Sequence, residues 1–131
     1  MKRPFASEAE ANYQENTMPY LKIQMSRGLE PEKSKALLAA ASQRIASELG
    51  KPERYVMVEL TSNPAMLFAG TDEPAAFLEL KSIGLPAGKT KVLSRALCSL
   101  LEDFAGIAPT RVYIEFTDAA GSFWGWNSST F

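Results

Sequence analysis

The fold is decided by two similar stretches of the sequence, GKPERYVMVEL at residues 50–60 and GIAPTRVYIEF at residues 106–116. Each begins with a glycine that suits the end of a helix, and each ends in the alternation that is typical of a half-buried strand. Placing Gly50 on Gly106 also aligns Glu59 with Glu115. We therefore predict that the chain contains an internal duplication of one structural unit.

The residues that precede each stretch complete a strand–helix–strand unit. Before the first, residues 20–25 alternate between apolar and other side chains, and Pro31 suits the first turn of a helix. Before the second, residues 77–83 predict a strand, followed by a helix that ends at Gly106. A further short strand is predicted for residues 66–69, between two turns. The apolar helix faces are expected to comprise Leu38, Ala41, Ile45 and Leu49 in the first unit and Leu93, Leu97, Leu100 and Phe104 in the second.

This duplication predicts an α/β fold. Each unit is expected to join two parallel strands by a right-handed crossover. The two units together give a four-stranded mixed sheet with two helices on one face, which leaves the opposite face uncovered. Because an uncovered, partly apolar face usually packs against another surface, we expect the chain to form an oligomer.

The composition excludes several classes of function. The 131 residues suffice for one domain, and a formal net charge of −1 provides no basic surface for a nucleic acid. No stretch is long and apolar enough for a membrane span. The chain has no histidine, which excludes histidine-based acid–base catalysis and histidine metal ligands. A single cysteine, Cys98, excludes an internal disulfide and a multi-cysteine metal site, so no metal is expected.

The start of the chain differs in composition from the rest. Residues 1–18 are expected to be an N-terminal extension that is weakly ordered or non-native, and residues 19–131 to be the domain. A blocking or targeting segment is the alternative. Because the extension has no apolar run of the kind found in secretory signals, we expect a cytoplasmic protein, with release without a signal peptide left open.

A few residues have positions from which they could carry chemistry. Tyr113 and Glu115 lie two apart on a predicted strand and therefore share one of its faces. Lys51 follows the first helix, and Ser82 with Ile83 ends a strand just before the second helix, where backbone N–H groups are left free. For each, a plain structural role is the alternative: a packed ring, a solvated lysine, a paired carboxylate.

The C-terminal tail is rich in aromatic residues. Residues 124–131 read WGWNSSTF and place Trp124, Trp126 and Phe131 among turn-forming residues. Aromatic side chains at this density usually fill an interface or form a pocket wall, with packing beneath the tail as the alternative.

Several short motifs agree in order and spacing with one known family. They are Met18-Pro19, Gly50-Lys51-Pro52, Gly70 with Glu73-Pro74, Lys81-Ser82-Ile83-Gly84, Arg111-Val112-Tyr113-Ile114, Gly125-Trp126-Asn127 and Ser129-Thr130-Phe131. In these motifs the chain resembles the macrophage migration inhibitory factor and D-dopachrome tautomerase family. The resemblance covers residues 19–131, and the tail at residues 122–124 looks closer to plant and microbial members.

The resemblance implies a duplicated subunit that assembles as a homotrimer, with active sites between subunits. It implies keto–enol tautomerisation of small aromatic α-keto acids, typified by phenylpyruvate, without cofactor or metal. The base in such enzymes is the amine of an N-terminal proline. An α-amine has a pKa of about 7.7–8.0, and apolar burial beside a cation lowers it toward neutrality, where proton abstraction next to a carbonyl is efficient.

Carried over by position, the resemblance makes Pro19 the base. Lys51 and the backbone N–H of Ile83 would hold the substrate carboxylate. Tyr113, from the neighbouring subunit, would line the pocket. The residues expected at or near its hydrophobic wall are Trp124, Trp126 and Phe131, and the roles of Ser82 and Glu115 are left open.

The chain departs from the family pattern in three places. A two-cysteine redox motif of the family falls on residues 75–78 and is absent. Glu115 replaces an asparagine that contacts ligand in animal members, which puts the substrate preference in question. With residues 1–18 attached, the Pro19 nitrogen is a tertiary amide and cannot act as a base.

Two other functions therefore remain open. The first is a cytokine-like or signalling binding protein that recognises a protein receptor through the same pocket, with little or no catalysis. The second is a ferredoxin-like regulatory domain, which would form a dimer rather than a trimer.

Overall fold

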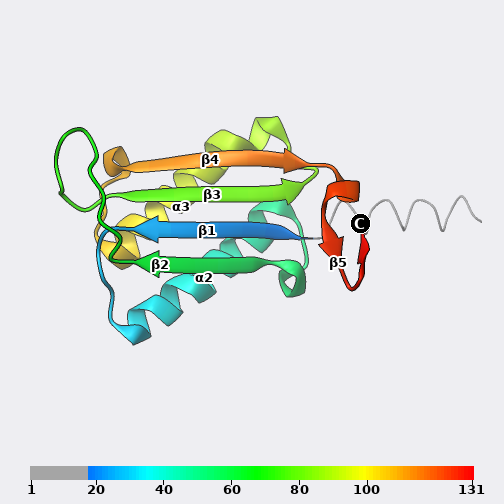
Figure 1. Ribbon diagram of the computed structural model, residues 1–131, viewed down its shortest axis with the longest axis horizontal. Coiled ribbons are helices and arrows are strands. Elements are labelled where there is room, and N and C mark those ends of the chain that lie inside the picture. The colour runs from blue at the N-terminus through cyan, green and yellow to red at the C-terminus, as the bar shows by residue number, and fades with distance from the viewer. Residues whose placement is uncertain (1–17) are drawn as a thin grey trace, which may run out of the picture.

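The computed structural model describes residues 18–131. The predicted extension therefore lies outside the described residues, except for Met18. The described chain forms a four-stranded sheet with both helices against one face (Figure 1). A small two-stranded ribbon follows at the C-terminus. The elements in chain order are β1 (Pro19–Met25), α2 (Pro31–Leu49), β2 (Met57–Ser62), β3 (Ala76–Ile83), α3 (Thr90–Ala105), β4 (Val112–Ala119), β5 (Gly125–Trp126) and β6 (Ser129–Thr130).

The strand order β2-β1-β3-β4 confirms the predicted mixed sheet. β1 pairs in parallel with β2, and β3 pairs in parallel with β4, as expected for two strand–helix–strand units. The two units meet through the antiparallel pair β1–β3, in which Leu21 lies opposite Leu80. Because β1 and β3 are the inner strands and run in opposite directions, each unit begins at a different end of the sheet.

The two glycines that the repeat aligns end the two helices. Gly50 has φ 63° and Gly106 has φ 68°, the left-handed conformation in which a side chain is unfavourable. The backbone N–H of each donates back to carbonyls of the last helical turn, which satisfies groups that the helix end leaves unpaired. The local sequence thus fixes where each helix stops and where the next strand begins.

The hydrophobic core lies between the helices and the covered face of the sheet. Along β1 and most of β3, every second residue is buried, as the alternation predicts. In α3, Leu93, Leu97 and Leu100 are buried as predicted, and Phe104 is partly buried against the core. In α2 one position is wrong, because Leu37 is fully buried whereas Leu38 is only half-buried. The buried cluster comprises Leu21, Ile23, Met25, Leu37, Ala41, Ile45, Ala76, Leu78, Leu80, Leu85, Leu93, Leu97, Leu100, Leu101, Ala105 and Ile107.

The predicted strand at residues 66–69 is also wrong. That segment belongs to a loop beyond the end of the sheet, with only an isolated bridge between Phe68 and Thr71. The loop is held by Arg111, whose guanidinium donates to the carbonyl oxygens of Phe68 at 2.7 Å and Glu73 at 2.8 Å. The Phe68 carbonyl accepts from the Arg111 side chain and from the backbone N–H of Thr71 in the same loop, so the segment pairs with no strand of the sheet.

The second face of the sheet is uncovered in the single chain, as predicted. Met57 and Tyr113 are each 65% exposed on it. A polar row crosses its middle, where Lys22 lies opposite both Glu59 and Glu79, and Glu115 lies opposite Glu79. Among the helices of residues 18–131, none combines the length and apolar character that a membrane crossing requires.

Candidate active site

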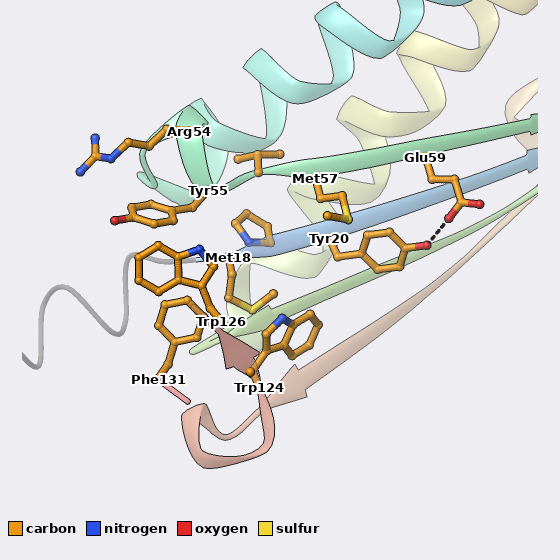
Figure 2. A pocket seen from close by; sticks show the side chains of 12 residues that line it. Met18, Tyr20, Arg54, Tyr55, Met57, Glu59, Trp124, Trp126 and Phe131 are labelled. Carbon is orange, nitrogen blue, oxygen red and sulfur yellow. Dashed lines mark hydrogen bonds between the residues drawn. The ribbon is translucent and has the colours of Figure 1, made fainter. Parts of the chain in front are cut away.

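A cavity of about 460 Å³ lies at the end of the sheet where β1 begins (Figure 2). β1, the turn before β2, β2 itself and the C-terminal tail all contribute to it. Four residues named from the sequence, Pro19, Trp124, Trp126 and Phe131, are therefore brought together. The full lining comprises Met18, Pro19, Tyr20, Arg54, Tyr55, Val56, Met57, Glu59, Trp124, Gly125, Trp126 and Phe131.

Pro19 enters the cavity because it is the first residue of β1. It is buried and pairs in register with Ser82 near the end of β3. Met18, which precedes it, has φ 47°, is 7% exposed and lines the same cavity. With Met18 attached, the Pro19 nitrogen is part of a peptide bond and has no basic lone pair.

The C-terminal tail forms an aromatic wall because it folds back as a hairpin. Asn127 and Ser128 have φ values of 55° and 63°, as in the tight turns that connect paired strands. The β5–β6 ribbon then brings the Trp126 and Phe131 rings into a stack with centroids 5.6 Å apart. The Tyr55 ring meets Trp126 edge-on at 5.7 Å, which extends the wall to the turn before β2.

Arg54 adds a positive charge beside this wall. Its guanidinium lies 4.9 Å from the centroid of the Tyr55 ring, a cation–π arrangement. The guanidinium is itself exposed and lines the cavity. An anionic ligand would therefore find a cation at this side of the opening.

Lys51 is not part of the cavity lining. Its side chain is buried, and Nζ donates to the carbonyl oxygen of Ile83 at 2.7 Å. Ser82, which is fully buried, donates its hydroxyl to the same carbonyl at 3.3 Å. Since Ser82 lies opposite Pro19 in register, the structure brings Lys51, Ser82 and Ile83 to the same end of the sheet as the cavity.

Tyr113 and Glu115 are not at the cavity of their own chain. Tyr113 pairs with Phe77, near the opposite end of β3 from Ser82, and its ring lies 4.7 Å from that of Phe68. Glu115 is exposed in the middle of the open face. Their shared face is confirmed, but within one chain neither reaches Pro19.

The sequence interpretation missed a polar pair in the cavity, Tyr20 and Glu59. The Tyr20 hydroxyl donates to Oε1 of Glu59 at 2.5 Å. The hydrogen bond to this carboxylate is the main reason why the pKa of Tyr20 is raised to about 12. Burial and the negative charges of Glu59 and Glu79 contribute less. One signal in the sequence could have pointed to Tyr20. It directly follows Pro19, and it alternates with the buried residues of β1, which places its side chain on the open face of the sheet.

Among residues 18–131, no group of three or more histidine, cysteine, aspartate or glutamate side chains is arranged to hold a metal ion. Cys98 lies on α3, away from the cavity, and burial raises the pKa of its thiol.

The family model and the sequence relatives that match this chain all belong to one family. The model of the family described as macrophage migration inhibitory factor matches residues 18–131. The macrophage migration inhibitory factor of Mus musculus is 40% identical over 95 residues, which are 72% of this chain and 83% of that protein. A homologue from Brugia malayi is 41% identical over 99 residues, 75% of this chain and 86% of that one.

Solved structures agree with the sequence relatives. A macrophage migration inhibitory factor homologue from Prochlorococcus marinus has a TM-score of 0.81 and 39% identity, covering 86% of this chain and 98% of its own. A protein called Pt0534, solved after inactivation by 2-oxo-3-pentynoate, has a TM-score of 0.76 and 26% identity, covering 84% of this chain and 93% of its own.

Proposed function

The chain belongs to the macrophage migration inhibitory factor family, and from this we propose that it catalyses the cofactor-free keto–enol tautomerisation of small aromatic α-keto acids such as phenylpyruvate. The observation that carries the proposal is the position of Pro19. It is buried at the start of β1, in a cavity with an aromatic wall, and the Lys51 cation lies at the same end of the sheet. The inactivation of Pt0534 by a 2-oxo acid supports an α-keto acid as the substrate, without bearing on its aromatic ring.

In the proposed reaction, Pro19 acts as the base when it is the first residue of the chain. Its secondary amine takes a proton from the carbon next to the keto group, and the electron pair of that C–H bond forms the enolate. Water then protonates the enolate oxygen to complete the enol, and the protonated Pro19 amine returns its proton to the solvent. Burial and the neighbouring Lys51 cation both lower the pKa of an amine, which suits a base that works near neutral pH.

Substrate orientation would come from charge at one end and apolar contact at the other. Lys51 and the backbone N–H of Ile83 would hold the carboxylate, and Trp124, Trp126 and Phe131 would contact the rest of the molecule. We further propose a homotrimer in which Tyr113 of a neighbouring copy completes the pocket. Two observations support this assembly, the 65% exposure of Tyr113 and the uncovered sheet face on which it lies.

A second candidate function is supported by Met18. Its peptide bond to Pro19 removes the base, and its buried side chain takes up part of the cavity. A chain that keeps this residue would bind an aromatic ligand or a protein receptor without turning it over. The two candidates therefore differ in one chemical group, the amine of Pro19.

The test is the rate of phenylpyruvate enol formation by two chains, the full chain and one that begins at Pro19. All strands and both helices of the described fold lie within residues 19–131, so the shorter chain retains every element. We expect turnover only in the shorter chain. Pro19→Gly in that chain is the control, because a primary amine at the same place should lower the rate while circular dichroism is unchanged. Equal rates in the two chains would rule out Pro19 as the base.

A further inference from the structure

The turn that follows β3 is held from β4 by one carboxylate. Oδ1 of Asp118 accepts a hydrogen bond from the backbone N–H of Leu85 at 3.0 Å. Asp118 lies near the end of β4, opposite Ser82 in the parallel pair β3–β4. Because Ser82 also lies opposite Pro19, this turn is at the end of the sheet where β1 begins, the same end as the candidate site (Figure 1). Leu85 belongs to the buried core, so Asp118 fixes the point at which the turn enters it.

Gly84 separates this anchor from the peptide of Ile83. It has φ 68°, a left-handed conformation, and as a glycine it is the residue of the turn with the greatest backbone freedom. On one side of it, the Ile83 carbonyl accepts from Nζ of Lys51 at 2.7 Å. On the other side, the N–H of Leu85 donates to Asp118. The backbone around Gly84 is therefore held by two side chains, one on each side of the glycine.

Lys51 is fixed independently of this turn. Its backbone N–H donates to the carbonyl oxygen of Ala46 at 2.9 Å, within the cap that ends α2. In the contact between Lys51 and Ile83, the lysine is thus tied to a helix end, whereas Ile83 is tied to a turn that depends on Asp118. A displacement of the turn would move the Ile83 backbone relative to Nζ of Lys51.

We propose that Asp118 is a positioning residue for the carboxylate of the substrate. Asp118 acts through the turn, which it holds so that the Ile83 backbone and Lys51 lie where both reach one carboxylate. This role rests on the proposed function, in which those two groups bind the substrate carboxylate. Donors that are already in place bind a ligand more tightly, because they need no ordering when it arrives. The negative charge of Asp118 gives no advantage of its own, since it repels an anion.

Three substitutions separate the position of the acceptor from its charge. Asp118→Asn keeps an acceptor oxygen at the same place and removes the charge, whereas Asp118→Glu keeps the charge and moves the acceptor outward by one methylene. Asp118→Ala removes both. A positioning role predicts that Asn preserves carboxylate binding and that Ala and Glu weaken it. A direct effect of charge predicts instead that Glu resembles the wild type and Asn resembles Ala.

The first readout is binding, which does not depend on turnover. Both tryptophans of the chain, Trp124 and Trp126, line the cavity, and their fluorescence reports on its occupancy. The matched probes are 3-phenylpropionate and 3-phenylpropanamide, which share a ring and a chain length and differ in the charge of the end group. In the full chain and in the chain from Pro19, Asp118→Ala should weaken binding of the carboxylate by roughly three- to tenfold and that of the amide by less than about twofold. Asp118→Asn should leave both within about twofold of the wild type.

The second readout is phenylpyruvate turnover by the chain from Pro19. Asp118→Ala and Asp118→Glu should raise KM and leave kcat within about twofold, because the base at Pro19 is not displaced. A purely structural role would change the thermal midpoint without this division between KM and kcat. Asp103→Ala, at an exposed aspartate near the far end of α3 from the turn, is the control and should change neither KM nor the ratio of the two dissociation constants. Circular dichroism checks that each variant is folded.

The outcomes separate the positioning role from the proposed function. Equal losses for the two probes in Asp118→Ala, a loss in Asp118→Asn as large as in Asp118→Ala, or no binding of 3-phenylpropionate to either wild-type chain would overturn the positioning role. The expected pattern of binding without any turnover by the chain from Pro19 would refute the proposed function and leave the positioning role standing. Turnover with a KM that none of the Asp118 variants changes would do the reverse.

Discussion

Lys51 and Ile107 occupy equivalent positions in the two halves of the duplication, directly after the capping glycines, and both are buried. One is a cation and the other is apolar. Tyr20 and Phe77 are a second equivalent pair, both on the open face of the sheet. The hydroxyl of Tyr20 binds Glu59, whereas Phe77 has no group with which to bind the equivalent glutamate, Glu115.

These differences show that the scaffold accepts different chemistry at equivalent positions, both where the side chain is buried, as at Lys51 and Ile107, and on the open face, as at Tyr20 and Phe77. The second half fills them with apolar side chains, as stability favours. The first half places a buried cation, a hydroxyl and Pro19 at equivalent places, all at one end of the sheet. The candidate site is therefore the part of the duplication in which the two copies have diverged.

The largest effect on stability is expected when a core residue of the second half is replaced by the residue at the equivalent position of the first half. Ala41 in α2 is equivalent to Leu97 in α3, and both are fully buried. Leu97→Ala gives α3 the smaller residue without the compensating packing, and should lower the free energy of unfolding by about 2–5 kcal/mol. Urea denaturation measures this loss. A change below about 1 kcal/mol would show that the two helices are packed interchangeably.

Replacing Lys51 by an apolar residue, as at the equivalent position of the second half, should affect function more than stability. In the chain from Pro19, Lys51→Met removes the buried cation, and we expect KM for phenylpyruvate to rise by about tenfold or more. The midpoint of thermal unfolding should fall only modestly, because Met removes the hydrogen bond to the Ile83 carbonyl but Ser82 still donates to that oxygen. Lys51→Arg is the matched control and should recover part of the affinity. An unchanged KM in Lys51→Met would remove Lys51 from the site.

The capping glycines should respond equally, because the scaffold uses them in the same way. Both have positive φ, and a Cβ at either position would meet no atom within 4 Å. Gly50→Ala and Gly106→Ala should therefore each lower the free energy of unfolding by about 1 kcal/mol, the cost of a left-handed alanine. Only the first should also change KM, since it adjoins Lys51. Unequal stability losses would show that the halves differ in their caps as well.

The smallest effect concerns the phenol that only the first half has. The pKa of Tyr20 is raised from 10.0 to about 12 in the folded chain by the Glu59 carboxylate. A raised pKa means that the contribution to stability is complete below pH 10 and is lost as the pH rises toward 12. The midpoint of unfolding should fall less steeply over this range in Tyr20→Phe than in the wild type. Identical slopes would indicate that the hydrogen bond to Glu59 is absent in solution.

The sequence allowed the scaffold to be predicted because its signals are local. A glycine at a helix end and an apolar alternation each act within a few residues, so the sheet, both helices and the duplication followed. The error at Leu38 arose because two adjacent leucines leave the helix face ambiguous. The segment at residues 66–69 was misassigned because the side chain that holds it, Arg111, is distant in the sequence.

The candidate site was only partly predictable for a related reason. Pro19, Trp126 and Phe131 were found through motifs of the family and the dense aromatic tail. The Tyr20–Glu59 pair depends on the register between β1 and β2, which no single stretch of sequence specifies. Whether Tyr113 and Glu115 belong to the site depends on a second copy of the chain.

If the amine of Pro19 is the reactive group, 2-oxo-3-pentynoate should label it covalently. The triple bond of this 2-oxo acid is conjugated with its ketone, so an amine can add to it: a new N–C bond forms, and a proton passes to the adjacent carbon. Mass spectrometry of peptides from the chain that begins at Pro19 should locate the label on Pro19, with loss of phenylpyruvate turnover. The full chain, in which the nitrogen is an amide, should remain unlabelled there. A label on Lys51 instead, or equal labelling of both chains, would contradict the assignment of Pro19.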